Sequence, residues 1–317
     1  MSTPRISVLM AVRDGLPYLR EALDSILTQS RTDFEFLVID DGSADGSREM
    51  AEEIGDPRIR VLINERNLGL TRSLNLGLRA AQGEYLARQD ADDVSLPQRL
   101  EVQADYLDRN PEVGLTACSV EYMDSEGGTE CVDARGLSAG VLRWHLLFGN
   151  EIPHSGVMFR RREVLDLGGY DESLPFAQDY ELWSRLSRRT DLVRLERVLL
   201  RYRRHQGALS ATRKEEQYRI RDLIGGANMA RLLKREVDPG TIRALHTPGS
   251  EKGRCRDAAR LIRELGKAFL ESGRLSGAEV REVRADLKAR LRGVAKSHLR
   301  VRPGEALAVL LGLPGRG

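Results

Sequence analysis

Three carboxylates lie close together in the stretch YLARQDADDVSLP at residues 85–97. Asp90 and Asp92 are one residue apart and directly follow a β-favouring run at residues 85–89. Because alternate residues of a strand point to the same side, both carboxylates can face one side at the carboxyl end of this strand. Two like charges repel there unless a cation lies between them, and Mg²⁺ is commonly held by one or two carboxylates together with substrate phosphates. The spacing therefore indicates a metal-assisted phosphate site.

The same stretch has a second interpretation. Ser95 and Pro97 are typical of the start of a helix, where Ser accepts hydrogen bonds from free N–H groups and Pro suits the first turn. The carboxylates would then form a solvated acidic turn that caps the next helix. The choice between the two interpretations depends on which other polar residues the fold places beside Asp90 and Asp92.

The elements before this stretch alternate between strands and helices. β-Favouring runs lie at residues 6–12, 34–39, 60–63 and 85–89, and helical patterns lie at 16–28, 45–54 and 71–81. This order predicts a parallel sheet with right-handed crossovers, whose ligands bind beyond the carboxyl ends of the strands. Polar residues at three strand ends then meet at one edge: Arg13, Asp14, Asp40, Asp41, Asp90 and Asp92. The acidic stretch thereby becomes part of a site.

The rest of the chain first continues the α/β pattern and then changes. Helices are predicted at 98–109, 141–148 and 161–167, strands at 113–120, 155–159 and 192–200, and a loop or hairpin at 121–140. A further helix begins at Asp179 and buries a stripe that includes Trp183. Beyond residue 210 the pattern is helical and rich in arginine. We therefore expect a domain of residues 1–210 followed by a helical, basic C-terminal region of residues 211–317.

Charge is distributed unevenly along the chain, although the formal net charge is only +2. Residues 1–210 carry 26 Lys/Arg and 35 Asp/Glu, whereas residues 211–317 carry 24 and 13. A basic region attached to an acidic body indicates an anionic partner, such as membrane headgroups, a lipid-phosphate acceptor or nucleic acid. The alternative is a solvated helical face. The region lacks interleaved aromatic residues, which argues against recognition of single-stranded nucleic acid.

Composition and motifs argue against several classes of protein. No apolar run approaches the ~20 residues that span a bilayer, and no signal peptide is predicted. The three cysteines are widely spaced and indicate reduced thiols in a cytosolic protein. Neither a G-x-G-x-x-G segment after the first strand nor a G-x-x-x-x-G-K-S/T segment occurs, which argues against dinucleotide oxidoreductases and P-loop NTPases.

Short motifs recur in a fixed order over residues 4–210. They are ISVLM (6–10), RDG (13–15), VIDDGS (38–43), NLGLTRSLN (67–75), GEYLARQDADD (83–93), HSGVMFR (154–160), GGYDE (168–172), QDYELW (178–183) and YRRH (202–205). In this order and spacing the chain resembles the inverting glycosyltransferases of family 2. The resemblance implies the GT-A fold, a Rossmann-like and mostly parallel central sheet flanked by helices, and a nucleotide-sugar substrate.

The resemblance also implies roles in binding the nucleotide and the metal. Asp92 would ligate Mg²⁺ or Mn²⁺, His205 would complete the metal shell, and Asp90 would contact the ribose. Asp41 would accept the N3–H of a uracil, which favours UDP as the nucleotide. The other nucleotide-binding candidates are Ala11, Val12, Arg13, Arg72 and Ala91. The bound metal would neutralise charge on the departing nucleoside diphosphate. The alternative for His205 is a surface residue in a basic run.

Asp179 matches the catalytic base of the family. In an inverting transfer one carboxylate takes the proton of the acceptor hydroxyl as this attacks the anomeric carbon from the face opposite the leaving phosphate. The alternative role of Asp179, as a helix N-cap, is compatible with catalysis. His154 and Trp183 would shape the acceptor or donor pocket.

Two positions depart from the usual pattern of the family. The family often has an aromatic–Asn pair where this chain has Arg13 and Asp14, and a stacking guanidinium could replace the aromatic ring. The family also often has Glu directly before the base, where this chain has Gln178. The first departure affects the choice of base in the nucleotide, and the second affects the pKa of Asp179 or a contact to the acceptor.

These features predict a metal-dependent, inverting hexosyltransferase that uses a nucleoside diphosphate sugar, UDP foremost. The expected acceptor is a hydroxyl of a lipid-linked glycan or a surface polysaccharide precursor. The protein would be cytoplasmic, with its basic C-terminal helices at the inner face of the cell membrane. One alternative is a sugar nucleotidyltransferase, which would need a Gly-rich loop after the first strand. Another is a non-catalytic binding module with a nucleic-acid-binding tail, although nucleic acid is not the expected partner.

Overall fold

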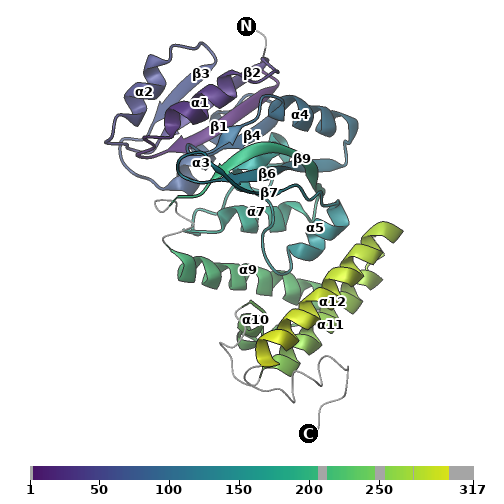
Figure 1. Cartoon of the computed structure of the whole chain (residues 1–317). Helices are drawn as coiled ribbons and strands as arrows, with labels where there is room; N and C mark the ends of the chain where they lie inside the picture. The colour runs from purple at the N-terminus through teal and green to yellow at the C-terminus, as the bar shows by residue number, and fades with distance from the viewer. Residues whose placement is uncertain (1–2, 206–212, 247–253, 274, 300–317) are drawn as a thin grey trace. The chain divides into compact units, whose positions relative to one another are not determined.

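The computed structural model describes residues 3–205, 213–246, 254–273 and 275–299 (Figure 1). Internal contacts divide the chain into two compact units. The first comprises Met1–Ala139 and Ile152–Lys214, and the second comprises Gly140–Glu151 and Glu215–Gly317. The chain therefore enters the second unit, returns to the first and then leaves it again. The predicted division at residue 210 does not include this excursion and stays a prediction.

A mixed sheet forms the centre of the first unit. In spatial order its strands are β3 (Ile59–Ile63), β2 (Phe34–Asp40), β1 (Ile6–Val12), β4 (Tyr85–Gln89), β8 (Val157–Arg160), β6 (Val113–Met123), β9 (Asp191–Arg203) and β5 (Val94–Ser95), and β7 (Thr129–Asp133) pairs with β6. The first four strands are parallel, β8 is antiparallel to both neighbours, and β6 and β9 run parallel. The predicted α/β class is confirmed, with a sheet that is parallel in its first half.

Helices flank this sheet. They are α1 (Leu19–Leu27), α2 (Ser47–Glu53), α3 (Leu70–Ala80), α4 (Arg99–Arg109), α6 (Arg161–Leu165) and α7 (Gln178–Leu186), with the 3₁₀ helix η1 (His154–Gly156) before β8. Strands β1 and β2 are apolar on both faces because both faces are covered. Val8 packs in one cluster with Leu23 of α1 and Leu100 of α4. Leu9 faces the other way, toward Gly77 of α3.

Strand β5 changes the interpretation of the residues after the acidic stretch. Ser95 does not cap the next helix, because it lies in β5 and its hydroxyl donates to Gln89 Oε1 at 2.7 Å. The helix α4 begins later, at Arg99. In β5, Val94 pairs with Arg201 of β9. This pairing brings the end of β9 beside the acidic stretch.

The second unit is helical, which confirms the helical C-terminal region. It contains α5 (Ala139–His145), α9 (Lys214–Leu233), α10 (Pro239–His246), α11 (Cys255–Glu271) and α12 (Gly277–Leu299). Trp144, Leu147 and Phe148 pack in one cluster with Met229 of α9 and Leu265 of α11. Over the described residues, no helix has the length and apolar composition needed to cross a membrane.

Candidate active site

The carboxyl ends of β1, β2 and β4 lie side by side in the sheet. Val12 pairs in register with Asp40, and Met10 pairs with Gln89. The residues that follow these strands, Asp41 and Asp90 among them, therefore share one edge of the sheet. This confirms that the polar strand ends gather, as the order of elements predicted.

Asp41 is buried, with 4% of its surface exposed, and holds the loop that follows β3. Its Oδ1 accepts hydrogen bonds from Asn64 Nδ2 and the Leu68 N–H, each at 2.8 Å. Its Oδ2 accepts from the Gly69 N–H at 2.9 Å. A carboxylate offers about four lone-pair sites, so Asp41 keeps room for one further donor. The predicted contact with a uracil stays a prediction.

Asp90 lies over a buried arginine. Arg88 is fully buried in β4, and its Nη2 donates to Asp90 Oδ1 at 2.5 Å. The Asp90 N–H donates to the hydroxyl of Ser155 at 2.9 Å. Arg88 thus fixes the side chain of Asp90 and Ser155 fixes its main chain, while 30% of the side chain remains exposed to solvent.

Asp92 and His205 meet although they are far apart in the sequence. His205 Nε2 lies 3.0 Å from Asp92 Oδ2. Burial raises the pKa of Asp92, and the nearby charge of Asp90 raises it further, while the His205 contact acts in the opposite direction. Burial also raises the pKa of Asp93 well above its usual range, with Asp92 and Asp90 adding to the effect. Burial is the larger cause for both residues, and repulsion between neighbouring carboxylates adds to it.

This donor set fits a divalent cation that is shared with a substrate. A carboxylate oxygen and an imidazole nitrogen suit Mn²⁺, and a carboxylate also suits Mg²⁺. Throughout the described segments, no group of three His, Cys, Asp or Glu side chains is arranged to hold a metal by itself. Asp92 and His205 would therefore hold the cation as a pair, and phosphate oxygens and water would complete its shell.

A layer of rings lies beside Asp90. His154 Nε2 lies 2.9 Å from Tyr170 Oη, and both rings lie against the ring of Trp183. Burial lowers the pKa of His154 to about 3, the Arg88 charge lowers it further, and Asp90 raises it. Trp183 is fully buried, and its indole N–H has no hydrogen-bond partner within the described part of the chain. Trp183 thus supports the ring layer from behind, and His154 is neutral at physiological pH.

Asp179 lies in the first turn of α7, after Ala177 in the left-handed conformation (φ 55°). The Tyr180 N–H donates to Asp179 Oδ1 at 2.8 Å. Burial raises the pKa of Tyr170, the Arg88 charge lowers it, and the smaller contributions of Asp179 and Asp90 raise it. The two carboxylates therefore act on the same phenol, one from the helix and one from the acidic stretch. The role of Asp179 as the catalytic base stays a prediction.

The remaining candidates differ in exposure. The side chain of Arg13 is 51% exposed and lies 3.7 Å from Asp14 Oδ2. The side chain of Arg72 is 58% exposed and forms an ion pair with Glu172 at 3.5 Å. Val12 is buried, and Ala11 and Ala91 are half-buried. The roles assigned to these residues stay predictions.

Three residues at the site were not predicted from the sequence: Arg88, Tyr170 and Arg203. Arg88 and Arg203 are buried arginines, and Tyr170 is buried against His154. A signal existed for Arg88, because it is the only charged residue in an otherwise buried five-residue strand. No comparable signal marked Arg203, which stands in a run of basic residues.

Comparison with known sequences places the chain among sugar-transferring enzymes. The family model for glycosyl transferase family 2 matches residues 7–166. An uncharacterized glycosyltransferase of Haemophilus influenzae is 30% identical over 244 residues, which cover 73% of this chain and 75% of the relative. The amylovoran biosynthesis glycosyltransferase AmsE of Erwinia amylovora is 32% identical over 170 residues, or 53% of this chain and 63% of the relative.

Solved structures share the fold. TarS of S. aureus (residues 1–349, in complex with UDP) has a TM-score of 0.60 at 16% identity, covering 96% of this chain and 89% of that one. The mannosyltransferase PcManGT of Pyrobaculum calidifontis, in complex with GDP-Man and Mn²⁺, has a TM-score of 0.54 at 20% identity. The match covers 98% of this chain and 87% of PcManGT. The GT-A fold expected from the sequence is thereby confirmed.

Proposed function

Because the chain belongs to glycosyl transferase family 2, we propose that it transfers a hexosyl group, with inversion, from a nucleoside diphosphate sugar to an acceptor hydroxyl. UDP is the favoured nucleotide. The observation that carries the proposal is the 3.0 Å contact between Asp92 and His205. It joins two potential metal ligands at the sheet edge where the nucleotide-binding candidates gather. The UDP complex of TarS supports the choice of nucleotide.

The chemistry follows from two groups of residues. Asp92 and His205 would hold Mg²⁺ or Mn²⁺, which supplies Lewis-acid neutralisation of the diphosphate. Asp179 accepts the proton of the acceptor hydroxyl while the hydroxyl oxygen bonds to the anomeric carbon. The bond from that carbon to the diphosphate breaks, and the nucleoside diphosphate leaves with the electron pair. Attack from the opposite face inverts the anomeric configuration.

Release of nucleoside diphosphate across a panel of UDP- and GDP-sugars, with Mn²⁺ or Mg²⁺, tests the proposal. The expected result is release of UDP that depends on the divalent cation. Asp92→Ala should abolish metal-dependent donor binding, measured by calorimetry. Arg162→Ala is the control, because its side chain is 92% exposed on α6 and forms an ion pair with Asp166 at 3.8 Å. Consumption of a nucleoside triphosphate with release of pyrophosphate would instead favour a nucleotidyltransferase.

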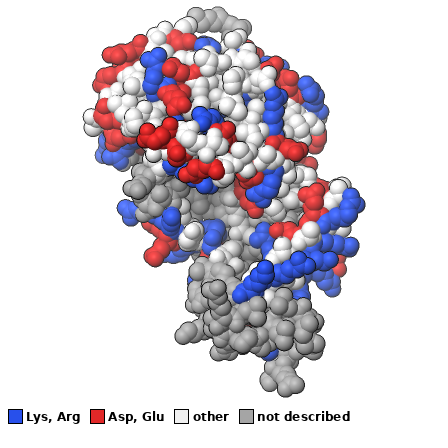
Figure 2. All heavy atoms as spheres, in the orientation of Figure 1, with Lys and Arg blue, Asp and Glu red and all other residues white. Residues whose placement is uncertain are grey.

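The acceptor is proposed to be a lipid-linked glycan or a surface polysaccharide precursor, reached at the cytoplasmic face of the membrane. The name of AmsE, an amylovoran biosynthesis enzyme, supports a polysaccharide pathway. On α12, the exposed basic residues repeat at helical spacing and form one stripe: Arg281, Arg284, Lys288, Arg292 and Lys296. Figure 2 shows Lys and Arg side chains gathered along α12. Such a stripe suits anionic headgroups, with about 1 kcal/mol for each basic residue near the surface.

Liposome co-sedimentation of the full chain tests this membrane contact. Replacing Arg284, Lys288 and Arg292 by Gln removes about 3 kcal/mol of attraction, so binding to anionic vesicles should weaken about 100-fold. The control replaces three exposed arginines of the first unit, Arg48, Arg79 and Arg162, by Gln. Undiminished binding of the α12 variant would remove the membrane proposal and leave the transfer reaction untouched.

A further inference from the structure

Arg203, the last residue of β9, lies behind the Asp92–His205 pair. Only 3% of its surface is exposed. The main-chain N–H of Arg203 donates to Asp93 Oδ1 at 2.8 Å. The pairing of Val94 with Arg201 brings this end of β9 to the acidic stretch. Arg203 is therefore a buried cation whose main chain is bonded to the carboxylate of Asp93, the residue that follows the predicted metal ligand Asp92.

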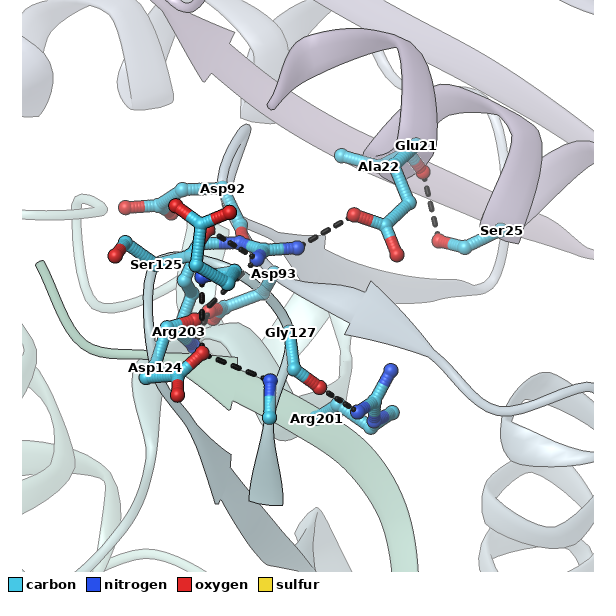
Figure 3. A network of polar contacts seen from close by, with 12 residues as sticks. Glu21, Ala22, Ser25, Asp92, Asp93, Asp124, Ser125, Gly127, Arg201 and Arg203 are labelled. Atoms are coloured by element: carbon cyan, nitrogen blue, oxygen red, sulfur yellow. Dashed lines mark hydrogen bonds and ion pairs between the residues drawn. The ribbon is translucent and has the colours of Figure 1, made fainter. Parts of the chain in front are cut away.

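The guanidinium of Arg203 joins three separate segments (Figure 3). Its Nε donates to the Asp92 carbonyl at 3.0 Å. Its Nη1 donates to the carbonyls of Asp124 and Ser125, at 3.4 and 3.2 Å, in the turn between β6 and β7. Its Nη2 donates to Glu21 Oε2 of α1. This geometry uses the planar fork of guanidinium donors, which a lysine ammonium cannot reproduce.

A second contact links Arg203 to His205. The Arg203 Cζ lies 4.5 Å from the ring centroid of Tyr18, and the rings of Tyr18 and His205 lie 5.1 Å apart. Tyr18 therefore contacts both the guanidinium and the imidazole. Arg203 fixes the main chain of Asp92 directly and supports the ring of His205 through Tyr18.

We propose that Arg203 is a positioning residue that sets the separation of Asp92 and His205 and thereby the affinity of the site for a divalent cation. The inference rests on the proposed function, because it assumes that these two residues hold the cation. Residues that orient metal ligands from behind change metal affinity or activity by about 10- to 100-fold when they are substituted. Substitution by Lys keeps the positive charge and removes the planar fork of donors, so it separates the geometric contribution of Arg203 from its charge.

The experiment compares Arg203→Lys with Arg194→Lys. Arg194 lies in the same strand, is equally buried at 3%, and its Nη2 donates to the Asp133 carbonyl at 3.0 Å. Binding of Mn²⁺ in the presence of saturating UDP is followed by the electron paramagnetic resonance signal of free Mn²⁺, and circular dichroism reports folding. We expect Arg203→Lys to raise the Kd of Mn²⁺ about 10- to 100-fold and Arg194→Lys to leave it within about twofold.

An unchanged Kd in folded Arg203→Lys, or an equal rise in both variants, overturns the inference. If Arg203→Lys does not fold, Glu21→Ala decides, because the Glu21 side chain is 52% exposed and its loss should not prevent folding. Glu21→Ala should raise the Kd of Mn²⁺ about two- to fivefold, the effect of a partly exposed ion pair, and an unchanged value overturns the inference. A wild-type chain that takes up no Mn²⁺ with UDP or GDP refutes the metal-dependent function itself, and the inference falls with it.

Discussion

His154 offers a test of how closely the site is packed, because its protonation depends on burial. Its ring lies 6.1 Å from the ring of Trp183, and its Nε2 lies 2.9 Å from Tyr170 Oη. Burial lowers the pKa of His154 to about 3, and the charge of Arg88 adds to that effect while Asp90 opposes it. A neutral imidazole at this place cannot serve as a cationic ligand for a diphosphate.

The consequence for stability has a definite sign. An unfolded histidine has a pKa of about 6.5, so below that pH the unfolded chain binds a proton that the folded chain does not. The free energy of unfolding therefore decreases as the pH falls from about 6.5 toward the folded value. Between pH 7 and pH 5 the decrease from His154 amounts to about 2 kcal/mol. His154→Gln keeps a hydrogen-bond partner for Tyr170 and should not show this decrease.

Urea unfolding at pH 7 and pH 5 measures the difference. The chain has two tryptophans, one in each unit, so Trp144→Phe is introduced into both proteins and the fluorescence of Trp183 then reports the unit that holds His154. From pH 7 to pH 5, the free energy of unfolding of His154→Gln should decrease by about 2 kcal/mol less than that of its parent. Equal losses in the two proteins would refute the burial of a neutral His154. The ring resonances of His154 should also keep their neutral shifts down to pH 5.

Three further outcomes follow from single contacts. Asp179→Asn should leave donor binding unchanged and lower kcat about 10²- to 10⁴-fold, and a normal kcat in a transfer assay would exclude Asp179 as the base. Gly83→Ala should destabilise the first unit by about 1–3 kcal/mol in urea unfolding, because its Cβ would lie 2.5 Å from the Ser7 main-chain nitrogen. Asp133→Asn should lower the free energy of unfolding at pH 7. Since hydrogen bonds from Arg135 and Arg194 lower the pKa of Asp133, the difference from wild type should shrink as the pH falls below about 4, and a constant difference would contradict that cause.

The first half of the fold could be predicted from local sequence. Strands β1 and β4 have the predicted bounds because each is a buried run that ends at a charged or polar turn. Strand β5 could not be predicted, since it has two residues and exists only through its pairing with β9. Strand β9 extends to Arg203, three residues beyond the predicted end, because its last three residues pair with Glu121–Met123 of β6.

Site residues that belong to sequence motifs could be predicted. Site residues whose role depends on burial and tertiary contacts could not. Asp92 and His205 were named together only through the family resemblance, since no local pattern joins residues so far apart in the sequence. Ser95 was misassigned because a hydroxyl before a helix and a hydroxyl in a short strand look alike in sequence. Arg203 stands beside Arg204, which is exposed, and only tertiary contacts distinguish the two.

Because Gly140–Glu151 belongs to the second unit but lies within the sequence of the first, the C-terminal helices cannot be removed without affecting the rest of the protein. A protein shortened after β9 would leave Trp144, Leu147 and Phe148 in water, each forgoing about 1.5–3 kcal/mol of apolar burial. Shortened proteins of this kind should aggregate because of these exposed side chains, so a loss of activity in them would say nothing about membrane binding by the missing helices. The tail and this internal segment must also change together in any relative that exchanges one tail for another.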